Sequence, residues 1–188
     1  MKFYVVRHPW TESNVKKITQ GWADSPLIPE GVEMAERLAN FLKNKSISKI
    51  FTSDLGRCIQ TSEIINKILK VDICKIKKLR EQNFGKFNGL DKEIIKKEFD
   101  ETNHSAIPSD GESLLQMKDR VLGYIKNELP RKENNVLIVT HTGCFQSILS
   151  DALKIDLTSE ECHTNPLTIC LFELTNKNIK LIERFDID

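Results

Sequence analysis

The sequence VLIVTH at residues 136–141 decides the fold more than any other stretch of the chain. Four consecutive apolar residues leave no position to face solvent, which is typical of a strand buried on both faces of a sheet. The apolar run stops at Thr140-His141. Because such a strand needs helices on both sides, this stretch predicts a largely parallel sheet inside a layered α/β protein.

A second strand of this kind opens the chain. Residues 2–6 read KFYVV and are followed directly by Arg7-His8. Ligands of open α/β sheets bind at the carboxyl ends of the strands, so His8 and His141 can be neighbours at one edge of the sheet. A guanidinium beside an imidazole suits phosphate, since arginine binds phosphate oxygens through a planar fork and histidine can act as a nucleophile.

The rest of the chain alternates between strand-like and helix-like runs, and Asp54 is expected to cap one of the helices. The pattern predicts a three-layer α/β/α architecture with a mostly parallel central sheet, in a single domain spanning residues 1–188. Its last two strands flank Asn176-Lys177-Asn178, a hairpin signal. The expected strands are 2–6, 47–52, 71–76, 135–140, 167–174 and 179–185, and the expected helices are 30–45, 55–69, 91–100, 112–128 and 143–153.

Composition narrows the functional classes. The chain has 28 Lys and Arg against 27 Asp and Glu, so no charge excess indicates nucleic acid or an anionic membrane surface as a partner. Five scattered cysteines without C-x-x-C spacing favour neither a disulfide framework nor a zinc site, and they fit a reducing cytoplasm. We expect no signal peptide and no membrane span, which would need roughly 18 apolar residues.

Three further groups could complete an anion site. Arg57 lies near the start of an expected helix, where backbone N–H groups and the helix dipole favour anions. Thr11 and Asn14 supply donors in the loop after His8. Glu81, in a loop, could protonate a leaving alkoxide. Ordinary alternatives exist: His8 could be a histidine in a loop, His141 a half-buried histidine at a strand end, Arg57 a solvated surface arginine, and Glu81 a carboxylate facing water.

Five motifs, taken in order, resemble the histidine phosphatase superfamily, which has the phosphoglycerate mutase-like fold. The motifs cover most of the chain, and an Arg-His pair alone would be weak evidence. They are RHPWTESN at 7–14, SDLGRCIQT at 53–61, LREQNFGKFNG at 79–89, DGES at 110–113 and VTHTG at 139–143.

The resemblance implies the roles of the site residues. His8 would be the nucleophile and become a phosphohistidine. Arg7, Arg57 and His141 would hold the phosphoryl oxygens, while Glu81 would protonate the leaving alcohol and then deprotonate the attacking water. The resemblance implies no metal and no cofactor.

Other residues would shape the substrate pocket. Asn14, Thr11 and Thr142 would add donors, and Trp10 would either roof the pocket or pack its loop onto the core. Lysines 16, 17, 86 and 92 could meet a second acidic group of a substrate. This sequence departs from the family pattern in three places: Pro9 stands for glycine, Thr142 for glycine or alanine, and Gln146 for an arginine present in many members.

We therefore expect a metal-independent phosphomonoesterase acting on a small phosphorylated metabolite. The alternatives are phosphoglycerate mutase-type phosphoryl transfer and a non-catalytic phosphate-binding module. The resemblance implies that mutases are longer, with insertions that shield the phosphohistidine from water. A phosphatase is favoured here because residues 91–109 are the only sizeable insert between Glu81 and the turn at 111–113. A cysteine phosphatase is excluded, since no C-x-x-x-x-x-R loop follows Cys144. The terminal hairpin could present an edge strand to a second copy, so a homodimer stays open.

Overall fold

A six-stranded sheet with the order β4-β3-β6-β1-β7-β8 forms the centre of the molecule. The computed structural model describes residues 1–100, 102–133 and 135–187. Neighbouring strands among β4, β3, β6 and β1 are parallel, whereas β7 and β8 run antiparallel at one edge. The strands are β1 (Lys2–Arg7), β3 (Lys49–Thr52), β4 (Asp72–Lys75), β6 (Val136–Thr140), β7 (Thr168–Thr175) and β8 (Asn178–Asp186).

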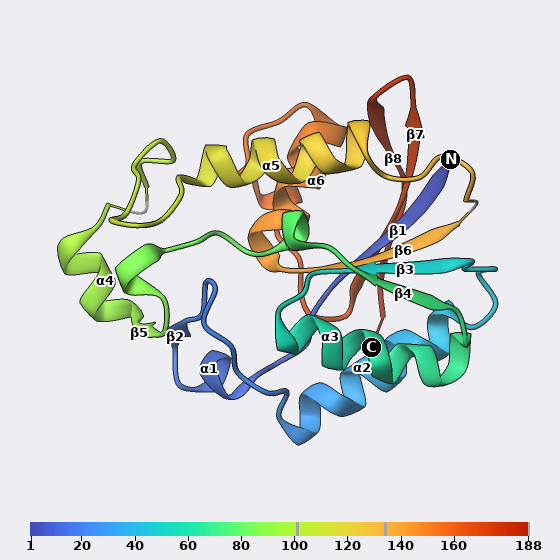
Figure 1. Cartoon of the computed structure of the whole chain (residues 1–188), viewed down its shortest axis with the longest axis horizontal. Helices are drawn as coiled ribbons and strands as arrows, with labels where there is room; N and C mark the ends of the chain where they lie inside the picture. Colours follow the sequence, from blue (N-terminus) through green and yellow to red (C-terminus); the bar gives the residue numbers. More distant parts are fainter. Residues whose placement is uncertain (101, 134, 188) are drawn as a thin grey trace.

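Helices cover both faces of the sheet, as Figure 1 shows. Alternate residues of β1 point to opposite faces, as the pleat of a strand requires. Phe3 and Val5 belong to the core shared with α5 and α6, whereas Tyr4 and Val6 belong to the core shared with α2 and α3. The predicted three-layer architecture is therefore confirmed. These helices are α2 (Pro29–Leu42), α3 (Gly56–Leu69), α5 (Leu114–Asn127) and α6 (Thr142–Leu153).

The terminal hairpin was predicted correctly, and its turn explains why. Asn176 and Lys177 have φ angles of 49° and 64°, the left-handed conformation that tight hairpin turns need. Asparagine adopts this conformation more readily than most residues, because its short polar side chain bonds to the nearby backbone. Each of the other predicted strands and helices also lies within three residues of its expected ends.

A small peripheral unit lies beside the carboxyl end of β1. Two-residue strands β2 (Ile18–Thr19) and β5 (Leu90–Asp91) pair antiparallel there, next to the short helices α1 (Glu12–Val15) and α4 (Lys92–Glu98) (Figure 1). Helix α4 corresponds to the expected helix 91–100, whereas the two strands and helix α1 were not predicted. The two-residue strands and the four-residue helix α1 are too short for a hydrophobic period to be visible in the sequence. The 3₁₀ turns η1 (Lys77–Leu79), η2 (Gly85–Phe87) and η3 (Glu160–Cys162) escaped prediction for the same reason.

The expected cap of α3 was wrong. The N-cap residue is Leu55, which offers no side-chain acceptor, and Asp54 is engaged elsewhere. Its two carboxylate oxygens accept hydrogen bonds from Arg80 Nε and Nη2 at 2.6 and 2.7 Å. A bidentate, charge-assisted pair is stronger than a single bond to a backbone N–H, so Asp54 is drawn to Arg80.

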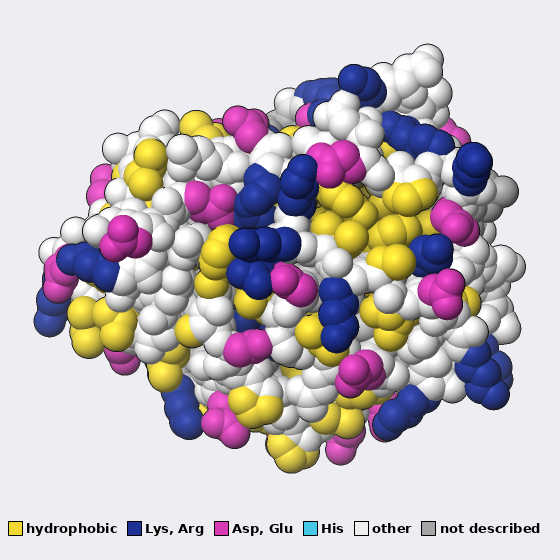
Figure 2. Space-filling view, viewed as in Figure 1, with side chains coloured by type: hydrophobic (Ala, Val, Ile, Leu, Met, Phe, Trp, Pro, Cys, Tyr) yellow, Lys and Arg dark blue, Asp and Glu magenta, His cyan; other side chains and the backbone are white. Residues whose placement is uncertain are grey.

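The surface mixes charges of both signs. Figure 2 shows Lys and Arg side chains interspersed with Asp and Glu over the face viewed in Figure 1. Among the described residues, no helix is long and apolar enough to cross a bilayer. The described part of the chain also holds no cluster of three or more His, Cys, Asp or Glu side chains suited to a metal ion. All five cysteines are free thiols.

Candidate active site

The register of β1 against β6 brings the two motif histidines together. Arg7 pairs with Thr140 across the parallel ladder, and the next backbone bond runs from His8 N–H to the Thr140 carbonyl at 2.9 Å. His8 and His141 therefore leave the sheet side by side. Their ring centroids lie 5.2 Å apart with one edge facing the other, and both side chains are buried.

Two contacts fix the tautomer of His8. Its Nδ1 lies 2.8 Å from the Pro9 carbonyl oxygen, which can only accept, so Nδ1 carries the proton. On the other side of the ring, Arg57 Nε–H donates to Nε2 at 3.2 Å, which requires a lone pair there. Burial, with Arg57 and Arg7 nearby, holds the pKa of His8 well below its ordinary value. The result is a neutral imidazole whose lone pair lies on Nε2, where it accepts from Arg57 Nε–H.

Arg57 is the most deeply buried cation of the site, with 1% of its side chain exposed. It is the second residue of α3, and its guanidinium donates to the carbonyl oxygens of Ala23 and Gly21 at 2.9 and 2.8 Å. Arg7 Nη1 donates to the Thr164 carbonyl at 3.0 Å, while its Nε is buried without a partner among the described residues. Arg57 thus contacts the imidazole of His8 directly, and Arg7 precedes His8 in the chain.

His141 is held by two side chains of the SDLGRCIQT motif. Its Nε2 lies 2.8 Å from Ser53 Oγ and 3.4 Å from the sulfur of Cys58. Burial lowers the pKa of His141 well below its ordinary value, and the nearby positive charge of Arg57 acts in the same direction. Both histidines are therefore neutral near pH 7.

The Glu81 carboxylate is oriented by two backbone donors. Gln82 N–H donates to Oε1 at 3.0 Å, and Gly143 N–H, in the first turn of α6, donates to Oε2 at 3.1 Å. The close approach needs a glycine, because a Cβ at position 143 would lie 2.6 Å from Oε1. The backbone carbonyl of Glu81 accepts from Trp22 Nε1 at 2.8 Å. This carboxylate therefore occupies a defined position.

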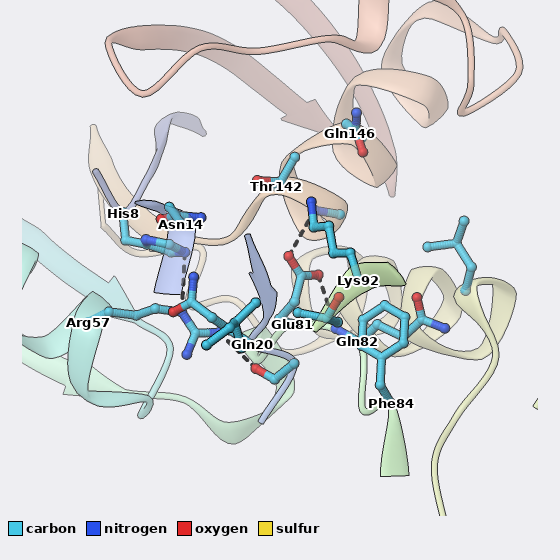
Figure 3. A pocket seen from close by; sticks show the side chains of 15 residues that line it. His8, Asn14, Gln20, Arg57, Glu81, Gln82, Phe84, Lys92, Thr142 and Gln146 are labelled. Carbon is cyan, nitrogen blue, oxygen red and sulfur yellow. Dashed lines mark hydrogen bonds between the residues drawn. The ribbon is translucent and has the colours of Figure 1, made fainter. Parts of the chain in front are cut away.

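These groups surround a cavity of about 310 Å³. In Figure 3, Arg57 and His8 lie at one end of it, with Glu81 and Lys92 across from them. Carboxamides and apolar side chains form the remaining walls, so the cavity can enclose a phosphoryl group and a small organic part. Its lining consists of His8, Asn14, Ile18, Thr19, Gln20, Gly21, Arg57, Glu81, Gln82, Phe84, Lys92, Leu114, Thr142, Gly143 and Gln146.

Most of the predicted site residues come together here, whereas two of the predicted substrate-binding residues lie outside the cavity lining. Asn14 and Thr142 line the cavity. Thr11 is buried and caps α1 instead, accepting from Asn14 N–H at 3.3 Å while its hydroxyl donates to Asn14 Oδ1 at 3.0 Å. Trp10 is 44% exposed, and its carbonyl accepts from Ile28 N–H. Arg7 and His141 are not part of the cavity lining, and His141 reaches the site through its edge contact with His8.

The two other departures noted in the sequence can now be placed. Pro9 offers no backbone N–H, but its carbonyl is the group that His8 uses. Gln146 lines the cavity, so an uncharged carboxamide occupies the place of a cation there. Of the four lysines that could meet an acidic group, Lys92 lines the cavity. Lys16 and Lys86 pair with Glu12 and Glu98.

Several residues that contact the site had no predicted role, among them Ser53, Gly143 and Asp24. Ser53 and Gly143 belong to the sequence motifs, so a signal was present for them. Asp24 lies in a loop distant in sequence from Arg57, and only the folded chain places its carboxylate against the Arg57 backbone N–H at 3.2 Å.

An α/β fold that sets Arg57 against a buried neutral histidine, with Arg7 next to it in the chain, is suited to binding a phosphoryl group. The profile of the histidine phosphatase superfamily (branch 1) matches residues 3–187, and the chain belongs to this superfamily. It is an enzyme of the phosphatase and phosphoglycerate mutase-like group.

Relatives of both activities are similar in sequence. A probable phosphoglycerate mutase of Proteus mirabilis is 32% identical over 169 residues, covering 85% of this chain and 78% of the relative. A broad-specificity phosphatase of Saccharomyces cerevisiae is 31% identical over 158 residues, covering 79% of this chain and 69% of the relative.

Solved structures agree on the fold. Bacillus stearothermophilus YhfR superposes with a TM-score of 0.87 at 26% identity, covering 96% of this chain and 94% of that one. The α-ribazole phosphatase of Shigella flexneri superposes with a TM-score of 0.82 at 22% identity, covering 97% and 95% of the two chains.

Proposed function

We propose that this protein is a metal-independent phosphomonoesterase that hydrolyses a small phosphorylated metabolite through a phosphohistidine on His8. The observation that carries the proposal is the tautomer of His8. The Pro9 carbonyl and Arg57 Nε–H each require the same neutral form, with its lone pair on Nε2. A neutral imidazole is the form that can attack phosphorus.

In the first half-reaction, Nε2 of His8 forms a bond to phosphorus while the bond from phosphorus to the ester oxygen breaks. Arg57 and Arg7 stabilise the charge on the equatorial oxygens, and neutral His141 can donate a further hydrogen bond. Protonated Glu81 gives its proton to the departing alkoxide, so the alcohol leaves neutral.

In the second half-reaction, the same carboxylate acts as a base. Glu81 takes a proton from water, the water oxygen bonds to phosphorus, and the bond between phosphorus and Nε2 breaks. Inorganic phosphate leaves, and His8 returns to the tautomer held by Pro9. Arginines and imidazoles supply the charge neutralisation, so the proposed reaction needs no metal ion.

Phosphoryl transfer between two positions of phosphoglycerate is the second candidate, and the similarity to the Proteus mirabilis relative favours it. The two reactions share the phosphohistidine and differ in what attacks it. Incubation with 3-phosphoglycerate separates them, because a mutase forms 2-phosphoglycerate whereas a phosphatase releases inorganic phosphate.

The direct test is hydrolysis of p-nitrophenyl phosphate in the presence of EDTA, comparing the wild type with His8→Ala. We expect activity in the wild type and a loss of at least about 10³-fold in the variant, the order found when a covalent nucleophile is removed. Equal rates in the two proteins, or a requirement for added metal, would overturn the proposal.

A further inference from the structure

The segment Gly21–Asp24 wraps around the guanidinium of Arg57. The carbonyl oxygens of Gly21 and Ala23 accept from Nη2 and Nη1 at 2.8 and 2.9 Å, and the carboxylate oxygen Oδ1 of Asp24 lies 3.4 Å from Nη1. Arg57 is nearly inaccessible to solvent, so this segment, rather than water, supplies its acceptors.

These contacts turn the Nε side of the guanidinium toward His8. Arginine has five N–H groups. In the described structure Nη1 donates to the Ala23 carbonyl and the Asp24 carboxylate, Nη2 donates to the Gly21 carbonyl, and the Nε–H donates to His8 Nε2, a contact that a phosphoryl group bound to Nε2 would replace. The Nε–H and the second Nη2–H form one side of the planar fork, the geometry that binds two phosphoryl oxygens at once. That side faces the nucleophile.

Asp24 is itself anchored on the first turn of α3. Its Oδ1 accepts from Arg57 N–H at 3.2 Å, and its Oδ2 accepts from Gly56 N–H. A Cβ at Gly56 would collide with Oδ2, so glycine at this position permits the contact. A carboxylate at a helix N-terminus is favoured by the helix dipole and takes the place of the missing side-chain cap.

We propose that Asp24 is a positioning residue for the phosphoryl site: it ties the start of α3 to Arg57 Nη1 and thereby aims the Nε/Nη2 edge at the phosphoryl group on His8. The proposal rests on the proposed function in taking a phosphoryl group as the ligand. Asp24 touches Arg57 and acts through it.

Two simpler roles predict different results. If Asp24 acted only through its charge, its removal would make the pocket more positive and strengthen the binding of an anion. If it served only to hold its loop on α3, its removal would lower stability and leave anion binding unchanged. A positioning role predicts weaker anion binding, the opposite sign to the charge effect.

The experiment compares Asp24→Ala and Asp24→Asn with the matched control Gln60→Ala. Gln60 also lies on α3 and also holds this loop, since its Oε1 accepts from Leu27 N–H at 2.9 Å, so its side chain is bonded to Leu27 rather than to the Arg57 guanidinium. Binding of inorganic phosphate and orthovanadate is measured from the increase in Tm over a ligand titration, and kcat/KM is measured with p-nitrophenyl phosphate.

We expect Asp24→Ala to weaken vanadate binding about tenfold and to lower kcat/KM by about 10²-fold, the cost of misplacing a charged donor by about 1 Å. In Asp24→Asn the amide oxygen can replace only one carboxylate oxygen, so binding should weaken about threefold or more. Gln60→Ala should lower Tm and leave binding within about twofold.

Tighter vanadate binding in either Asp24 variant would overturn the proposal in favour of the charge effect. Unchanged binding with a lowered Tm would overturn it in favour of a loop anchor. If Asp24→Ala does not fold, Asp24→Asn decides between the same outcomes. Vanadate binding needs no turnover. A wild type that hydrolyses no ester would therefore refute the proposed function, and the comparison of vanadate binding between the wild type and the variants would still test the role of Asp24.

Discussion

Replacing Gly143 by alanine tests whether the position of the Glu81 carboxylate matters for proton transfer. The added Cβ would lie 2.6 Å from Glu81 Oε1 and 3.2 Å from Met117 Cε, whereas ordinary contacts begin near 3.4 Å. The carboxylate must therefore retreat by about 0.8 Å (3.4 minus 2.6 Å). Glu81 is a flexible side chain, so the retreat costs little stability, and alanine is favoured over glycine inside a helix.

The displacement should instead reduce activity. Misplacing a catalytic group by about 1 Å can cost about 10²-fold, so we expect kcat/KM for an alkyl phosphate such as glycerol 3-phosphate to fall about 10- to 100-fold. The effect should be smaller with p-nitrophenyl phosphate, whose leaving group needs less help from an acid. Vanadate binding should stay within about twofold, because His8 and Arg57 are not displaced.

Gly123 provides the matched control, since it lies in α5 and a Cβ added there would meet no atom within 4 Å. Gly123→Ala should raise stability by about 0.5–1 kcal/mol and leave kcat/KM unchanged. If Gly143→Ala hydrolysed glycerol 3-phosphate at the wild-type rate, the link between Glu81 geometry and proton donation would be refuted.

The same geometry leads to three further predictions. Arg57→Lys should lower kcat/KM by about 10²–10³-fold in a steady-state assay, because an ammonium cannot offer the two parallel donors of the guanidinium; a loss below about threefold would contradict this. The pKa values of His8 and His141 are lowered in the folded state, so below the unfolded value of about 6.5 the unfolded chain binds more protons than the folded protein. The free energy of unfolding should therefore decrease as the pH is lowered, by up to about 1.4 kcal/mol per pH unit for each histidine. Urea unfolding between about pH 7 and pH 5.5 checks this, and a flat profile would count against two buried neutral histidines. Lys92→Met should lower kcat/KM more for 3-phosphoglycerate, which carries a carboxylate, than for p-nitrophenyl phosphate, since Lys92 lines the side of the cavity across from His8 (Figure 3). Equal losses for the two substrates would show that Lys92 does not bind a second acidic group.

The sheet and its covering helices could be predicted because each carries a strong local signal. The apolar run at 136–139 is compatible only with a buried segment, and it ends in a histidine that the register of β1 then places beside His8. The long amphipathic helices show a clear period. The resemblance carried by the five ordered motifs predicted that Arg57 and Glu81 join these histidines in one site, which hydrophobic periodicity alone does not indicate.

The parts that escaped prediction depend on contacts between distant segments. Asp54 was expected to cap α3, but the acceptor comes from Asp24, because Arg80 engages Asp54. Thr11 was expected in the pocket and instead pairs with Asn14 in a capping box, a choice that local sequence allows but does not force. The strands β2 and β5 form only because the fold brings residues 18–19 beside residues 90–91.

Phosphorylation of His8 during turnover is the step on which the proposed mechanism depends most. The most direct measurement is to mix the enzyme with a phosphomonoester in the presence of EDTA, quench within milliseconds in alkali, where phosphohistidine survives, and map the phosphate by mass spectrometry. We expect a phosphoryl group on Nε2 of His8 that is absent in His8→Ala and accumulates when Glu81→Gln slows its hydrolysis. Turnover of the wild type without any phosphoryl group on His8, or with the group on another residue, would contradict the mechanism.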